Sequence, residues 1–236
     1  MSEPDHPEIY RSQAEQYEAL VSREDCQGHI LTAIQQIQPL EGCRVVELGA
    51  GTARLTCLLA PLVRSIQAFD ISRSMLEVAI AKLASRGFTH WGAAVSDHRQ
   101  IPLPAATADL VISGWSICYL VVDNPRTWRQ ELERVMSEVR RLLRPGATFL
   151  LLETLGTGFE TPHPPQHLLE YYAYLQQAGF QHTWIRTDYQ FESLEIAREL
   201  AAFFFGAEML EKIRPNSQGA TLPECTGLWW LKAAGE

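Results

Sequence analysis

The sequence lacks paired-cysteine motifs and long apolar runs. Its cysteines are odd in number, scattered and never spaced as Cys-x-x-Cys: Cys26, Cys43, Cys57, Cys118 and Cys225. This pattern argues against a disulfide framework or a zinc site, so we expect no metal and a reducing, cytoplasmic environment. No apolar stretch approaches the roughly 20 residues that span a bilayer, and the polar residues 1–7 do not resemble a signal peptide. We therefore expect no membrane partner.

An excess of basic residues is also missing. The 236 residues carry a formal net charge of -8. Because binding to a phosphate backbone requires a basic surface, we expect no nucleic-acid partner. Arg140, Arg141 and Arg144 form the densest basic group, but they end a helical pattern, where cations suit the helix dipole. No repeat and no dividing linker is present, which predicts a single domain over residues 1–236.

Apolar runs alternate with helical patterns through the first two thirds of the chain. Alternation of this kind predicts βαβ units, a mostly parallel sheet and right-handed crossovers. The expected strands are 43–48, 64–69, 91–95, 108–113 and 147–153. The expected helices between them are 53–60, 72–86 and 127–143.

The two ends of the chain have different patterns. The first ten residues are expected to be loosely attached, and two helical patterns follow within residues 1–40. Residues 154–225 begin with a loop rich in glycine and proline. The patterns that follow predict a helix over 167–178, a strand over 181–190, helices over 192–205 and 207–213, and a connection containing proline and glycine. A last strand is expected over 226–233.

One strand-turn-helix-strand unit indicates a nucleoside site. The first apolar run ends in Glu47 and a Gly49-Ala50-Gly51 turn, and about 20 residues later the second run closes on Asp70. Glycines allow the backbone to approach a ligand closely, and an acid at this second position can accept hydrogen bonds from a ribose diol. The alternative for Asp70 is a plain helix cap.

Five segments in the same order resemble the class I S-adenosylmethionine-dependent methyltransferases. They are Val45–Ala53, Asp70–Leu76, Asp97 with Ile101–Pro104, Ala108–Ser113 and Leu143–Gly146. The resemblance implies a Rossmann-like α/β fold, with a seven-stranded mixed sheet whose last strand is antiparallel and helices on both faces. Ala53 stands where the family often has a third glycine.

The resemblance implies S-adenosyl-L-methionine as cofactor and S-adenosyl-L-homocysteine as product. Glu47 would meet the ammonium of the methionine part, Asp70 the ribose, and Asp97 the adenine amino group. Tyr10 or Tyr17, from a helical lid within residues 1–40, would contact the cofactor carboxylate; the alternative for both is core packing. The full set implied for the cofactor is Tyr10, Tyr17, Glu47, Gly49, Ala50, Gly51, Asp70, Ile71, Met75, Asp97, His98, Ser113 and Gly114.

The acceptor side is expected to come from the variable segments within residues 154–225 and from residues after the fourth strand. If the acceptor must lose a proton, a positioned side chain is needed. The candidate catalytic residues are Tyr119, Glu153, His163 and His167, with Trp115 as a wall of the same pocket. For either histidine, the alternative is an exposed loop residue. The aromatic side chains suggest a small organic acceptor.

Three alternatives remain open from the sequence alone. The first is a noncatalytic module that binds the same cofactor. The second is a nicotinamide-dependent dehydrogenase, which the absence of a third glycine after Gly51 disfavours. The third is a methyltransferase acting on a protein or RNA, against which the acidic charge balance weighs.

Overall fold

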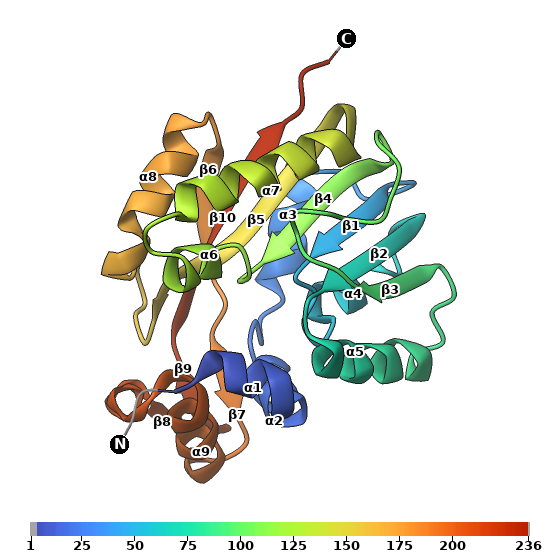
Figure 1. The fold of residues 1–236 in the computed structure, drawn as a ribbon. Helices are drawn as coiled ribbons and strands as arrows, with labels where there is room; N and C mark the ends of the chain where they lie inside the picture. Colours follow the sequence, from blue (N-terminus) through green and yellow to red (C-terminus); the bar gives the residue numbers. More distant parts are fainter. Residues whose placement is uncertain (1–3, 236) are drawn as a thin grey trace.

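The computed structural model describes residues 4–235, and a seven-stranded sheet forms its centre (Figure 1). The spatial order is β3-β2-β1-β4-β5-β10-β6. The strands are β1 (Arg44–Leu48), β2 (Ser65–Asp70), β3 (Trp91–Val95), β4 (Ala108–Gly114), β5 (Leu143–Thr157), β6 (Gln181–Arg186) and β10 (Glu224–Lys232). Strands β1 to β5 pair in parallel, whereas β10 runs antiparallel to both β5 and β6. The expected mixed sheet with an antiparallel last strand is confirmed.

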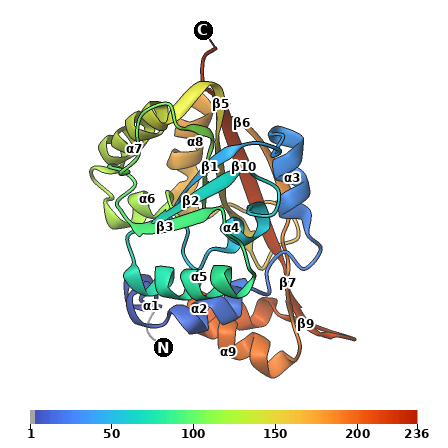
Figure 2. The same ribbon diagram turned by 90° about the vertical axis from the view of Figure 1, so that its right-hand side faces the viewer.

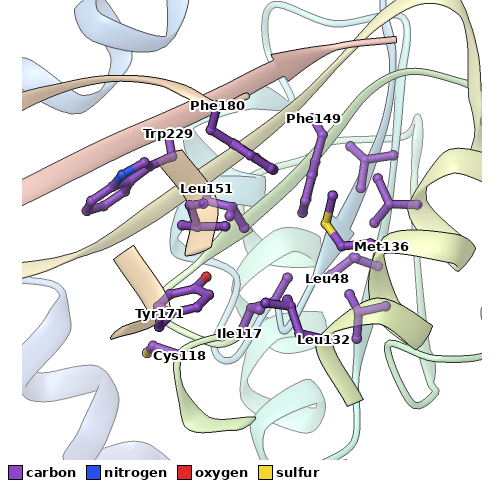
Figure 3. Packing of buried hydrophobic residues seen from close by; sticks show 14 of the residues in the cluster. Leu48, Ile117, Cys118, Leu132, Met136, Phe149, Leu151, Tyr171, Phe180 and Trp229 are labelled. Atoms are coloured by element: carbon purple, nitrogen blue, oxygen red, sulfur yellow. The ribbon is translucent and has the colours of Figure 1, made fainter. Parts of the chain in front are cut away.

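Helices cover both faces of this sheet, as expected (Figure 2). One face carries α3 (His29–Ile37), α4 (Arg54–Leu59) and α5 (Arg73–Ser85), and the other carries α6 (Tyr119–Asp123), α7 (Trp128–Leu142) and α8 (Leu169–Gln177), the last preceded by the 3-10 turn η1 (Gln166–Leu168). The strands read as continuous apolar runs because both of their faces are buried. Figure 3 shows the core beneath α7 and α8, where Met136, Phe149 and Trp229 are nearly inaccessible.

A second, smaller sheet was not expected from the sequence. Its three antiparallel strands lie in the order β7-β9-β8 and comprise β7 (Tyr189–Phe191), β8 (Arg214–Asn216) and β9 (Gly219–Leu222). Helix α9 (Leu194–Phe205) and the 3-10 turn η2 (Ala207–Lys212) join β7 to β8. The predicted single strand over 181–190 is therefore wrong: β6 ends at Arg186, and Tyr189 begins a strand of the other sheet.

The chain's first helices pack on this smaller sheet. Helices α1 (His6–Ser12) and α2 (Ala14–Val21) precede α3, and fully buried Leu20 lies in one cluster with Phe191, Ala201 and Leu222. We call α1, α2 and residues 187–222 together the cap. The cap lies below the carboxyl ends of the parallel strands in Figure 1. The expectation that the first ten residues are loosely attached is wrong for the described part, because α1 begins at His6 and buries Ile9.

None of the helices within residues 4–235 combines the length and apolar character needed to cross a bilayer. The same residues contain no group of three or more histidine, cysteine or acidic side chains placed to hold a metal ion.

Candidate active site

The turn after β1 depends on two glycines. Gly49 and Gly51 have φ values of +69° and +54°, in the left-handed region that glycine adopts without strain. A Cβ atom at Gly49 would lie 2.0 Å from Ser116 Oγ, whereas one at Gly51 would lie 3.6 Å from Met75 Cε. The backbone of β1 therefore passes into α4 with room for a ligand beside Gly51 but none for a side chain at Gly49.

Asp70 is fixed beside this turn by its own two oxygens. Its Oδ2 accepts a hydrogen bond from Gly51 N at 2.8 Å, and its Oδ1 accepts one from Ser72 N at 2.7 Å. Each carboxylate oxygen keeps a lone pair for a further donor. Helix α5 is capped by Ser72, whose Oγ accepts from Met75 N, so Asp70 is not the helix cap that was its alternative interpretation.

Glu47 is a buried carboxyl at the end of the neighbouring strand. Only 2% of its surface is exposed, and Thr56 Oγ1 donates to its Oε2. Burial raises the pKa of Glu47 to about 7, while the Thr56 hydrogen bond acts in the opposite direction. A cation bound beside Glu47 would restore the ordinary ionisation of this carboxyl.

These groups line a cavity of about 630 Å³ between the strand ends and the cap. This volume lies within the range of roughly 300–1,000 Å³ typical of small-molecule sites. The structure brings all but one of the expected cofactor residues to this cavity: Tyr10, Tyr17, Glu47, Gly49, Ala50, Gly51, Asp70, Ile71, Met75, Asp97, His98 and Gly114. The exception is Ser113, which is buried within β4 and does not line the cavity.

Asp97 lines the cavity and is also bound by a neighbouring arginine. Arg99 donates to Asp97 Oδ1 from its Nε at 2.7 Å and from its backbone N at 2.8 Å, and its guanidinium also pairs with Oδ2. These contacts lower the pKa of Asp97 to about 2. Next to it, His98 Nε2 lies 3.4 Å from Ser116 Oγ, and burial lowers the pKa of the His98 ring.

Of the expected catalytic residues, only Tyr119 lines the cavity. Glu153 lies inside β5 rather than at its end, is fully buried, and accepts hydrogen bonds from Cys118 N and Tyr171 Oη. His163 is exposed and stacks on Phe159, and His167 is exposed in η1. The structure does not bring Glu153, His163 or His167 to the cavity, and both histidines have the exposed-loop setting that was their alternative.

Arg54 and Trp115 form one wall of the cavity. The sequence indicated Trp115 as a wall residue but gave no sign of Arg54. The Arg54 guanidinium lies 3.6 Å from the centroid of the Trp115 ring and forms an ion pair with Glu24. Trp115 has a φ of +49°, a strained value for a residue with a side chain. Tyr189 of β7 also donates to Glu24, at 2.8 Å. Tyr189 of the cap is thus joined to the cavity wall through the buried ion pair of Glu24 and Arg54.

A cluster of rings covers the cavity on the cap side. We call it the aromatic wall: His6, Tyr10, Tyr17, Tyr119 and Phe204, in which neighbouring ring centroids lie 4.6–6.3 Å apart. The hydroxyls of Tyr10 and Tyr119 lie 2.6 Å apart. His6 and Phe204 were not singled out from the sequence, because 198 positions separate them and no local pattern marks their contact.

Residues 46–151 match the model of a family described as "Methyltransferase domain". These residues form a methyltransferase domain. A curated relative is the malonyl-[acyl-carrier protein] O-methyltransferase of Hahella chejuensis, 31% identical over 63% of this chain and 50% of that protein. Another is the ubiquinone/menaquinone biosynthesis C-methyltransferase of Rubrivivax gelatinosus, 28% identical over 55% of this chain and 44% of that protein.

The chain spans about half the length of these curated relatives. Solved structures share its fold at low sequence identity. A putative methyltransferase of Bacillus halodurans has a TM-score of 0.57 and 18% identity, over 86% of this chain and 98% of that one. Phosphoethanolamine N-methyltransferase 2 of Haemonchus contortus, in complex with S-adenosyl-L-methionine, has a TM-score of 0.63 and 14% identity, over 97% of this chain and 59% of that one. This likeness identifies the fold as that of class I methyltransferases.

Proposed function

We propose that this protein transfers a methyl group from S-adenosyl-L-methionine to a small organic acceptor. The observation that carries the proposal is the convergence of Glu47, the glycine turn and Asp70 on one cavity at the ends of β1 and β2. Ligands of open α/β sheets bind at this edge, where the strand order reverses. The match to the methyltransferase family over residues 46–151 supports the same assignment.

The side chains around the cavity fit each part of this cofactor. Asp70 has an acceptor lone pair on each oxygen for the two ribose hydroxyls. Ile71 is 70% exposed where it lines the cavity, an apolar surface that a flat adenine ring would cover. Glu47 is a buried carboxyl that a ligand ammonium would neutralise. When bound, the cofactor supplies an electrophilic methyl group on a sulfonium.

The protein's own contribution is to position the acceptor and to exclude water. The aromatic wall covers the cavity, and its tyrosines are uncharged, because burial raises the pKa of Tyr10 and Tyr119 well above the usual range. These hydroxyls can therefore orient an acceptor by hydrogen bonding, but they do not act as bases. The lid within residues 1–40 belongs to this proposal, with Tyr10 and Tyr17 covering the cofactor.

The relatives differ in the acceptors that their names give, which include an acyl-carrier-bound malonyl group, a quinone precursor and phosphoethanolamine. For this chain, the aromatic wall favours a small organic acceptor over a nucleic acid, as does the net charge of -8. A cytoplasmic location, without a membrane partner, remains part of the proposal.

Thermal unfolding with added ligands tests the cofactor assignment. A ligand present at about 100 times its dissociation constant stabilises the folded state by roughly 2.7 kcal/mol. We expect S-adenosyl-L-methionine and S-adenosyl-L-homocysteine, but not NAD, to raise the melting temperature of the wild type. Asp70→Asn should abolish the shift, whereas Glu77→Gln, an equal charge change at an exposed position of α5, should leave it intact. Stabilisation by NAD alone, or by none of the three, would contradict the proposal.

A further inference from the structure

His6 is the one histidine of the aromatic wall. It begins α1 and lines the cavity. Its ring stacks on Phe204 of α9 with centroids 4.6 Å apart, and it meets Tyr119 of α6 edge-on at 5.9 Å. Three elements that are distant in sequence therefore fix the position of this ring.

A single hydrogen bond determines which nitrogen of His6 carries the proton. His6 Nε2 lies 2.9 Å from the backbone carbonyl oxygen of Phe204. Because a carbonyl oxygen only accepts, Nε2 must be the donor. In the neutral ring, Nδ1 therefore holds the lone pair. This is the arrangement in which an orienting acceptor fixes one imidazole nitrogen and leaves the other as a base.

Several other titratable groups of the cavity are less suited to take a proton from an acceptor, and Asp123, at the end of α6, is the competing carboxyl that also lines the cavity. Glu47 and Asp70 lie at the glycine turn, where the proposed cofactor requires them. His98 lies beside Ser116 and the same turn. The side chains packed against His6 that titrate are Tyr10 from its own helix and Tyr119 from α6, and burial keeps both neutral.

We propose that His6 Nδ1 is the general base of the reaction and that the acceptor is a small phenol. This inference rests on the proposed function. Tyr10, Tyr17 and Tyr119 of the aromatic wall line the cavity, where a further flat ring could pack against their faces and edges. A phenol has a pKa of about 10, within reach of an imidazole base in a positioned pair, and it carries no charge that this wall would have to neutralise.

The proton and the electrons balance without a further reactant. The phenol O–H proton moves to His6 Nδ1 while the oxygen forms a bond to the methyl carbon. The carbon–sulfur bond breaks, and its electron pair stays on sulfur, leaving a neutral thioether. The His6 imidazolium then loses its proton to water, since the ring is only partly buried.

Binding of a chromogenic phenol tests the proposal without turnover. We would titrate 4-nitrophenol into the complex of the protein with S-adenosyl-L-homocysteine and follow the absorbance of the phenolate. In the wild type, the bound phenol should ionise at a lower pH than free 4-nitrophenol. His6→Gln should remove that shift, and His163→Gln, an exposed histidine away from the cavity, should retain it.

Turnover gives a second, independent criterion. With S-adenosyl-L-methionine and unsubstituted phenol, His6→Gln should lower kcat by about 100-fold or more, the contribution typical of a general base. With 4-nitrophenol at a pH where it is already ionised, the same substitution should change kcat much less. An equal loss for both phenols would overturn the assignment of His6 as base.

The outcomes separate this inference from the proposed function. Calorimetry with S-adenosyl-L-homocysteine shows whether the wild type and His6→Gln each bind this ligand, and the phenol titrations are made with both saturated. If the wild type does not bind that ligand, the proposed function fails. If it binds, but no phenol binds or His6→Gln behaves as His163→Gln does, only the inference about His6 fails. An Nδ1–H tautomer in the ¹⁵N spectrum of His6 would also overturn it.

Discussion

Glu153 illustrates how burial alone changes the chemistry of a single residue. Its Oε1 accepts hydrogen bonds from Cys118 N at 3.1 Å and Tyr171 Oη at 3.0 Å, while its Oε2 is buried without a partner among residues 4–235. Burial raises the pKa of Glu153 to about 7, against the opposing effect of these donors. The folded state therefore holds the Glu153 proton more tightly than the unfolded chain does.

This raised pKa predicts a loss of stability with rising pH. Because the folded pKa is above the usual 4.5, the stabilising contribution is present below about pH 4.5 and is lost as the pH rises through about 7. Between about pH 5 and pH 8, the wild type should lose up to roughly 3 kcal/mol more unfolding free energy than Glu153→Gln. Urea unfolding at both pH values measures this difference.

The control for this experiment is the exposed Glu77→Gln, which should follow the wild type at both pH values. Parallel pH dependence of the wild type and Glu153→Gln would mean that Glu153 is ionised in the folded protein at neutral pH.

Residues of the site could be predicted where the signal is local. Glu47, the glycines and Asp70 are marked by spacing along two consecutive strands, and the parallel register then brings Leu48 beside Phe69 and the turn beside Asp70. His6 has no such mark, because its partners are supplied by α6 and α9. The sequence pattern instead indicated His163 and His167, because they follow a strand. In the structure both side chains are exposed.

At the scale of elements, α1 is attached to the sheet layer by its backbone. The carbonyl oxygen of Tyr10 accepts hydrogen bonds from Ser72 Oγ at 2.6 Å and Ser74 Oγ at 2.7 Å, both at the start of α5. Helix α5 begins at Arg73, and only Ser72, its N-cap, separates it from Asp70 and Ile71. The same short segment therefore holds the lid and carries Asp70 and Ile71, the proposed contacts to the ribose and the adenine ring.

Loss of one of these hydroxyls should loosen the lid. A hydrogen bond of this kind contributes about 1 kcal/mol net, so Ser74→Ala should weaken binding of S-adenosyl-L-homocysteine about fivefold and increase hydrogen exchange in α1. Ser72 is a poorer choice, because it also caps α5. Ser85→Ala is the matched control: its Oγ bonds to the Lys82 carbonyl within the same helix. Equal affinities of the two variants would contradict a lid held in this way.

Elements of the parallel sheet were predictable because each has a continuous apolar run and a clear end. The ranges expected for β1 to β4 agree with the structure within one residue. The smaller sheet was missed for a physical reason. Its strands are only three or four residues long and include Pro215 and Gly219, so no alternation can be recognised. They are stabilised by packing against Leu20, which comes from the other end of the chain.

At the scale of the whole molecule, buried charges join the cap to the main sheet. Arg54 begins α4, and its partner Glu24 follows α2, with 17% and 3% of their side-chain surfaces exposed. Glu224 lies nearby, and burial raises its pKa to about 8, so this carboxyl is mostly neutral at pH 7. One cation therefore balances one carboxylate where the two parts of the molecule meet.

Removing one partner of this pair should be much more damaging than removing both. Arg54→Met leaves the Glu24 carboxylate buried without its cation, which should lower the unfolding free energy by about 3–5 kcal/mol. Adding Glu24→Gln to that variant should recover much of the loss, because no buried charge then remains unpaired. A double-mutant cycle by urea unfolding, without ligand, measures the coupling.

The exposed pair Arg129 and Glu170, 59% and 72% exposed, is the control and should show a coupling below about 1 kcal/mol. Additive effects of Arg54→Met and Glu24→Gln would mean that apolar packing around Leu20, rather than this ion pair, holds the cap in place.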